Sequence, residues 1–253
     1  MALPLSNLLE GTLRQTRYSP TRPTAIFDAD DTLWETQSLY TRSKKQFFDE
    51  MVRAGFSRKE VRDRFETIDH ANVPKLGFSK RRFPQSMFET YRALCFEHAK
   101  HFDRSIARRA RAIGTRVFDV SPRILRGVNE TLSKLRAQGV RLVLATKGDS
   151  ALQRHRIKQS GLRHYFDRVY IFPRKGTTEF KRILGAERLD HSISWSIGNS
   201  IKSDINPALA AGINAIWIPR KTWVYEDEEP VANARLCMAR SIREVPGIIF
   251  RRR

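Results

Sequence analysis

The sequence has no long hydrophobic run and very little cysteine. No stretch of about 18 apolar residues occurs among its 253 residues, so we predict no membrane span. The N-terminus carries Arg14 and Arg17 but lacks the apolar segment of a signal peptide. The two cysteines, Cys95 and Cys237, give neither a disulfide framework nor a metal-ligand spacing. These absences predict a cytoplasmic protein with no membrane partner.

Acidic residues are scarce relative to basic ones. The chain has 27 Asp and Glu against 47 Lys and Arg, which gives a formal net charge of +20 at pH 7. Such a balance attracts nucleic acid, anionic membrane surfaces or phosphorylated metabolites. However, the arginines are scattered, and the short basic clusters lack the interleaved aromatic residues of a single-strand binding platform. Nucleic acid is therefore a partner that the charge allows but does not favour over a solvated, Arg-rich surface.

Internal repeats and low-complexity segments are also missing, and strands instead alternate with helices. A hydrophobic content of 40% suits one large α/β domain, or a core with a smaller inserted domain. One predicted helix begins near Pro122, with Ser121 as its N-cap, and ends at Gly139. The alternation predicts a doubly wound parallel sheet. Its expected strands are residues 24–27, 140–145, 168–172, 194–197 and 215–218.

The segment 35–118 has a different pattern from the rest of the chain. Its apolar residues recur with helical spacing, and no strand-like run appears between residues 35 and 115. We therefore expect an α/β core domain made of residues 1–34 and 119–253, interrupted by a helical domain at 35–118.

Three carboxylates directly follow the first predicted strand. Ligands of open parallel sheets bind just beyond the carboxyl ends of the strands, where Asp28, Asp30 and Asp31 would lie. The side chains of Asp28 and Asp30 point to the same side because the two are two residues apart. Crowded carboxylates repel one another unless a cation or proton intervenes, which favours a metal site with one nucleophilic and one proton-handling Asp. The alternative is an Asx-type turn that caps the next helix.

Polar residues also follow three other predicted strands. Thr146 and Lys147 come after strand 140–145, where a hydroxyl at a helix entry suits either a bound phosphate or a plain N-cap. Lys175 is either a cation that balances phosphoryl charge or a solvated loop lysine. Asn199 and Asp204 offer oxygen ligands, although Asp204 alone is also a helix-capping candidate. Four such strand ends together are an unlikely coincidence.

This order of motifs resembles the haloacid dehalogenase superfamily of hydrolases. Asn199 departs from the pattern, because many members carry an acid there, and Gly176 stands where Pro is usual, so Lys181 is a minor rival to Lys175. The resemblance implies a Rossmann-like core with a helical cap inserted after the first motif. The matching segments are Asp28-Ala29-Asp30-Asp31-Thr32, Thr146, Lys175, and Gly198-Asn199-Ser200 with Ser203-Asp204.

The resemblance also implies a phosphatase that forms an aspartyl-phosphate. In that reaction Asp28 is the nucleophile and Asp30 the general acid and base. Thr146 and Lys175 hold the phosphoryl oxygens. A second Asp at position 30 favours phosphoryl transfer over dehalogenation, because a halide leaves without a proton.

The implied cofactor is Mg²⁺. Its expected ligands are the Asp28 carboxylate, the Asp30 backbone carbonyl and Asp204. Asn199 would contribute its side-chain oxygen or act through a bound water.

The expected substrate is a small phosphorylated metabolite. Residues 73–84 contain Pro74, Gly77 and Pro84 and are predicted to form a loop. Alternative functions are a phosphatase for nucleotides or nucleic-acid ends and a non-catalytic phospho-ligand binding module. The segment 221–253 packs beside the site or serves a partner, and the sequence assigns no oligomeric state. Candidates for contacting an anionic substrate are Lys80, Arg81, Arg82 and Lys147.

Overall fold

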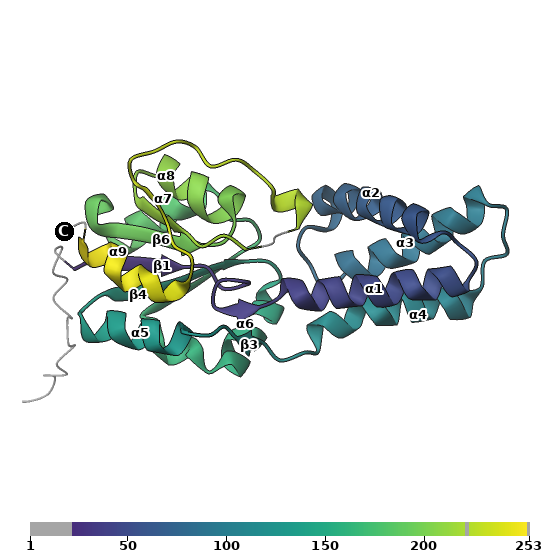
Figure 1. Ribbon diagram of the computed structural model, residues 1–253, viewed down its shortest axis with the longest axis horizontal. Helices are drawn as coiled ribbons and strands as arrows, with labels where there is room; N and C mark the ends of the chain where they lie inside the picture. Colours follow the sequence, from purple (N-terminus) through teal and green to yellow (C-terminus); the bar gives the residue numbers. More distant parts are fainter. Residues whose placement is uncertain (1–21, 221–222, 252–253) are drawn as a thin grey trace, which may run out of the picture.

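The computed structural model describes residues 22–220 and 223–251, and it shows an α/β core with a bundle of helices beside it (Figure 1). Arg14, Arg17 and residues 221–222 lie outside the described residues. The strand order is β5-β4-β1-β6-β7-β8, and every neighbouring pair is parallel, which confirms the predicted doubly wound sheet. The strands are β1 (Thr24–Phe27), β4 (Arg141–Lys147), β5 (Arg168–Phe172), β6 (Ser194–Gly198), β7 (Asn214–Trp217) and β8 (Leu236–Met238).

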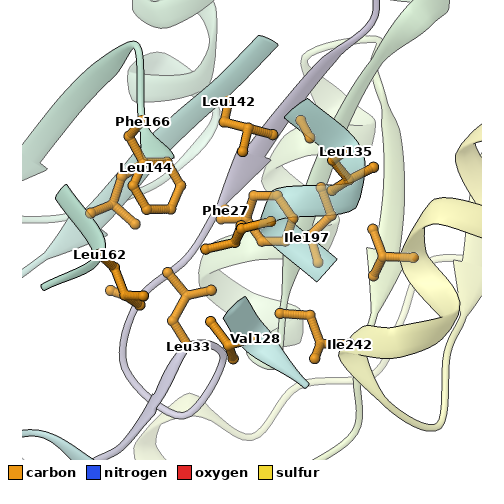
Figure 2. Packing of buried hydrophobic residues seen from close by; sticks show 14 of the residues in the cluster. Phe27, Leu33, Val128, Leu135, Leu142, Leu144, Leu162, Phe166, Ile197 and Ile242 are labelled. Atoms are coloured by element: carbon orange, nitrogen blue, oxygen red, sulfur yellow. The ribbon is translucent and has the colours of Figure 1, made fainter. Parts of the chain in front are cut away.

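Apolar side chains on one face of the sheet form the largest core cluster. Phe27 and Leu144 point to this face and are fully buried. The helices that cover it contribute further buried side chains, as Figure 2 shows. Burial of apolar surface on this scale is the main force that holds helices and sheet together. The covering helices are α5 (Val128–Ala137), α6 (Ser150–Ser160) and α9 (Val245–Arg251).

The opposite face of the sheet carries a second cluster. Ile26 and Val143 alternate with the residues of the first face, as the period of two in a strand requires. They pack against α7 (Thr177–Glu187) and α8 (Asn206–Ala210), so helices cover both faces. Parallel strands buried on both faces explain the nearly continuous apolar runs in the sequence.

In the sequence, four helices follow β1 before the chain continues with the other elements of the core. The chain enters and leaves them through β2 (Trp34–Glu35) and β3 (Arg123–Ile124), which pair antiparallel. The helices have their own cluster, in which the ring of Phe65 contacts the rings of both Phe47 and Phe83. The helices are α1 (Gln37–Arg53), α2 (Arg58–Leu76), α3 (Arg82–Glu97) and α4 (Arg104–Thr115).

Two sequence predictions about these segments are wrong. The helix expected from Pro122 begins only at Val128, because Arg123–Ile124 pairs with β2, a long-range contact that local pattern does not reveal. The loop expected at 73–84 is shorter, since α2 continues to Leu76 and α3 begins at Arg82. Pro84 lies in the first turn of α3, where backbone N–H groups have no intrahelical acceptor, whereas Pro74 lies inside α2 near its C-terminal end and removes one intrahelical hydrogen bond.

The last segment of the chain adds structure that the sequence did not predict. A short 3-10 turn at Val224–Glu226 is followed by edge strand β8 and helix α9. Among the described residues, none of the helices combines the length and apolar character needed to cross a membrane.

Candidate active site

The loop after β1 separates the three carboxylates of the first motif. Asp31 has a φ of 60°, and its carboxylate accepts hydrogen bonds from the backbone N–H groups of Thr36 and Gln37 at the start of α1. The capping turn considered above therefore applies to Asp31. Asp28 and Asp30 also line a cavity at the carboxyl end of the sheet, between the core and the helices α1–α3.

Lys175 contacts the carboxylates of both Asp28, which follows β1, and Asp204, which follows β6. Its Nζ lies 2.5 Å from Asp28 Oδ1 and 2.7 Å from Asp204 Oδ1, and it also donates to the backbone oxygen of Ala145 at 2.7 Å. All three charged side chains are nearly fully buried, with side-chain exposures of 2, 10 and 1% for Lys175, Asp28 and Asp204. Lys181, the rival, is exposed on α7 and does not line the cavity.

Burial strongly perturbs this cluster. It raises the pKa of Asp28 to about 7, with a further contribution from the nearby Asp204, while Lys175 acts in the opposite direction. For Lys175, burial alone would lower the pKa, but the two carboxylates raise it above its ordinary value. The cluster of two carboxylates and one ammonium carries a net negative charge and favours an additional cation.

The fourth motif holds Asp204 in a fixed position. The backbone N–H of Ser200 donates to Asp204 Oδ2 at 2.9 Å, and Asp204 sits in a single π-helical turn at Ile201–Ile205, a local irregularity that is frequent at functional sites. A Cβ on Gly198 would come within 2.2 Å of Asp204 Oδ2, so glycine leaves room for the carboxylate. Next to it, Asn199 Oδ1 accepts from the hydroxyl of Thr32 at 3.2 Å.

Asp30 is held by donors from several elements. Its Oδ1 accepts hydrogen bonds from Trp34 Nε1 and Thr36 Oγ1, both at 2.8 Å, and from Arg156 at 3.3 Å. Its Oδ2 accepts from Gln153 Nε2 at 2.7 Å. These contacts fix the carboxylate in one orientation beside the cavity.

The second motif contributes Thr146 and Lys147 to the cavity wall. Thr146 is 1% exposed at the end of β4. Lys147 Nζ lies 2.5 Å from both Glu226 Oε2 and Ser203 Oγ, and Glu226 also accepts from Ser200 at 2.9 Å. The carboxylate of Glu226, from the C-terminal segment, therefore forms an ion pair with Lys147, which the sequence suggested as a substrate-binding residue.

The three basic residues Lys80, Arg81 and Arg82 of the helical insertion differ in their surroundings. Arg82 is buried and lines the cavity, where it forms an ion pair with Asp69 and lies over the ring of Trp223. Lys80 and Arg81 are exposed and do not line it.

The cavity is also lined by residues that the search for site residues did not single out, among them five that contact a predicted site residue. No local pattern in the sequence marks them, because each comes to the site from a helix or segment that only the fold brings there. Trp223 and Glu226 belong to the segment whose packing beside the site was one of two sequence-based alternatives. The five are Asp69, Gln153, Arg156, Trp223 and Glu226.

The donor set suits a hard cation that keeps several water ligands. Among the described residues, no three His, Cys, Asp or Glu side chains group closely enough to hold a metal by themselves. The two buried carboxylates, Asp28 and Asp204, stand near the amide oxygen of Asn199 and the loop backbone at Asp30. Mg²⁺ is commonly bound through one or two carboxylates together with waters and substrate phosphate, so these residues fit it.

The comparisons with known proteins agree with this geometry. The sequence profile of the haloacid dehalogenase-like hydrolases matches residues 25–218, which is most of the chain. The chain therefore belongs to this family of hydrolases. All four strand ends described above lie within the matched range.

The relatives of known activity include phosphatases. A phosphoserine phosphatase from Thermus thermophilus is 29% identical over 119 residues, which are 45% of this chain and 46% of that protein. The chain thus matches less than half of that relative's length. A glyceraldehyde 3-phosphate phosphatase from Pyrococcus abyssi is 25% identical over 197 residues, 76% of this chain and 79% of that protein. A haloacid dehalogenase-like hydrolase structure from Xanthomonas campestris covers 91% of both chains at 25% identity, with a TM-score of 0.75.

Proposed function

We propose that this protein is a Mg²⁺-dependent phosphatase that hydrolyses a small phosphorylated metabolite through an aspartyl-phosphate. The observation that carries the proposal is the buried cluster in which Lys175 joins Asp28 to Asp204, with Asp30 held beside the same cavity. The phosphatases among the relatives support the same reaction class.

In the first step, a carboxylate oxygen of Asp28 attacks phosphorus, and the bond from phosphorus to the leaving oxygen breaks. Asp30 donates its proton to that oxygen, so the leaving group departs as an alcohol. In the second step, Asp30 takes a proton from water, whose oxygen attacks phosphorus and releases Asp28 and inorganic phosphate.

Thr146 and Lys175 stabilise the charge on the phosphoryl oxygens during both steps. The Lys175 ammonium already lies within 2.5 Å of Asp28, which places a positive charge next to the attacking group. Thr146 offers a hydroxyl from the end of β4. Fixed donors of this kind need no reorganisation during the reaction.

The metal would be held by Asp28, Asp204, the Asp30 backbone carbonyl and the Asn199 amide. When bound, Mg²⁺ supplies positive charge that reduces the repulsion between the nucleophilic carboxylate and the phosphate dianion.

We assign residues 35–118 the role of a cap domain over a core made of residues 1–34 and 119–253. Helices α1–α3 supply one wall of the cavity, as Tyr40 and Arg82 illustrate. A wall of this kind excludes water from the phosphoryl group and contacts the leaving group. Within the basic set suggested by the sequence, Arg82 and Lys147 are in place to do so.

The decisive experiment measures release of inorganic phosphate from a panel of phosphorylated metabolites, with Mg²⁺ or with EDTA. The wild-type protein should release phosphate only with Mg²⁺, and Asp28→Asn should abolish release. Asp63→Asn is the matched control, because Asp63 is an exposed residue of α2 outside the cavity. Release that persists in folded Asp28→Asn, or that resists EDTA, would rule out the proposed mechanism.

A further inference from the structure

The cationic side chains that line the cavity bear on the net charge of the leaving group that it can accept. Beyond the phosphoryl end, the described residues that line the cavity include four cations, which come from the insertion and from the core. They are Lys44, Arg82, Lys147 and Arg156.

Each of these cations already has a carboxylate partner. The Lys44–Glu66 and Lys147–Glu226 contacts measure 2.6 and 2.5 Å. Arg156 Nη1 lies 3.3 Å from Asp30 Oδ1, and Arg82 is in close contact with Asp69. Lys44, Arg82 and Lys147 are therefore not free to bind a second anion, and Arg156 lies beside Asp30, the proposed general acid and base.

The Arg82–Asp69 pair and the Arg156 side chain are the most deeply buried, whereas the Lys44 and Glu66 side chains are 17 and 32% exposed. The Arg82 and Asp69 side chains are 9 and 2% exposed, and that of Arg156 is 4% exposed. Breaking a buried ion pair leaves one charge without a partner in a medium of low polarity, which is strongly unfavourable. A second phosphate or a carboxylate on the substrate would also meet the negative charge of Asp69 or Glu226.

Apart from Asp31 and Asp149, whose carboxylates accept backbone N–H groups at the starts of α1 and α6, the rest of this lining is uncharged or apolar. It contains hydroxyl and amide groups, which bind alcohols, and aromatic rings, which bind carbon skeletons. These side chains include Gln37, Tyr40, Ser79, Phe83 and Trp223.

We propose that the substrate is a small phosphomonoester whose leaving group carries no net negative charge, such as an uncharged alcohol or a zwitterion. This inference rests on the proposed phosphatase function and narrows its substrate class. The cations at the wall are paired with carboxylates, and Asp31 and Asp149 add negative charge to the lining, so an anionic leaving group finds no free counter-charge there.

Four phosphomonoesters of similar size and different leaving-group charge provide the test. They are glycerol 3-phosphate (uncharged), O-phosphoserine (zwitterionic), 3-phosphoglycerate (anionic) and phosphoethanolamine (cationic). We expect kcat/KM for at least one of the other three to exceed that for 3-phosphoglycerate by tenfold or more. A smaller ratio, or a preference for 3-phosphoglycerate, overturns the inference while leaving a phosphatase. Release from none of the four overturns both proposals.

A variant that frees one cation tests the cause of the selectivity. Glu226→Gln removes the partner of Lys147, so kcat/KM for 3-phosphoglycerate relative to glycerol 3-phosphate should rise by about fivefold or more. Glu228→Gln is the matched control, because Glu228 is exposed and contacts Asn206 outside the cavity. If Glu226→Gln does not fold, Glu66→Gln frees Lys44 in the same way. An unchanged ratio in the folded variant contradicts the role of charge pairing.

Discussion

Individual carboxylates in this protein have distinct partners although they lie close together in sequence. Asp28 is buried between Lys175 and the cavity, Asp30 accepts four hydrogen bonds, and Asp31 binds the first N–H groups of α1. Residue type is the same in all three cases. Only the partners that the fold provides separate a proposed nucleophile from a proton carrier and from a capping residue.

Replacing Asp30 tests the proton-transfer role. We expect Asp30→Asn to lower kcat for alkyl phosphates by roughly 10²–10⁴-fold, the usual contribution of a general acid or base. For substrates with a good leaving group, such as p-nitrophenyl phosphate, the rate of the first step should fall less, because that group departs without a proton. Steady-state and burst-phase kinetics measure both effects. Equal losses in the first step for the two substrate types would contradict protonation by Asp30, and Asp63→Asn should match the wild type.

The pKa of Asp28 predicts a link between pH and metal. Burial and then Asp204 raise this pKa from 3.8 to about 7, so without a cation much of Asp28 is protonated and unreactive below pH 7. At limiting Mg²⁺, phosphate release should therefore rise as the pH increases through about 7. Saturating Mg²⁺ favours the carboxylate and should move this rise to lower pH. Rate profiles at two Mg²⁺ concentrations measure the shift, and superimposable profiles would contradict it.

At the scale of elements, the strand ends position the site. β1, β4 and β6 are adjacent in the sheet, and the residues that follow them meet at one edge together with Lys175 after β5. The turn after β6 depends on close packing, because Gly198 lies directly against the Asp204 carboxylate. The absence of a side chain at Gly198 therefore leaves room for Asp204, the proposed metal ligand.

Gly198→Ala tests that requirement. The added Cβ would meet Asp204 Oδ2 and Cγ at 2.2 and 2.4 Å, so the carboxylate must move away. We expect the Mg²⁺ concentration for half-maximal activity to rise more than tenfold. The control is Gly185→Ala on α7, where nothing lies within 4 Å of the new methyl group, and Ala favours the helix by about 1 kcal/mol. An unchanged Mg²⁺ requirement in Gly198→Ala would show that Asp204 does not hold the metal.

At the scale of the whole molecule, two hydrophobic cores are joined around one cavity. The sheet core and the helical insertion have separate buried clusters, and the segment at Trp223–Glu226 contacts both sides through Arg82 and Lys147. The net charge of +20 does not make the cavity lining basic, because the four cations that line it lie against carboxylates.

The insertion core can be tested with two phenylalanines. Phe65 is fully buried among aromatic neighbours, whereas Phe96 on α3 is 88% exposed. We expect Phe65→Ala to lower the free energy of unfolding by about 3–5 kcal/mol, and Phe96→Ala to change it by less than about 0.5 kcal/mol. Urea unfolding of both variants measures this difference. Similar values for the two would contradict a packed core in the insertion.

Strong local patterns predicted much of the fold and the places where the site residues lie. Short apolar runs ending in Asp28, Thr146 and Asn199 marked the carboxyl ends of strands, and the structure confirms the parallel sheet. The start of α5 was missed because the pairing of Arg123–Ile124 with β2 depends on residues far away in sequence. Arg82 was grouped with exposed neighbours because its partner, Asp69, lies on another helix.

The sequence alone determined the main alternation of strands and helices up to residue 218, the helical character of the insertion and the family, since periodicity and short motifs are local properties of the chain. Only the tertiary structure decided which charges meet. Lys147 pairs with Glu226, and Arg156 pairs with Asp30. In each pair, more than seventy residues separate the two partners in the sequence. Packing brings such groups together irrespective of sequence distance, and it is this pairing, not the total charge, that sets the electrostatics of the cavity.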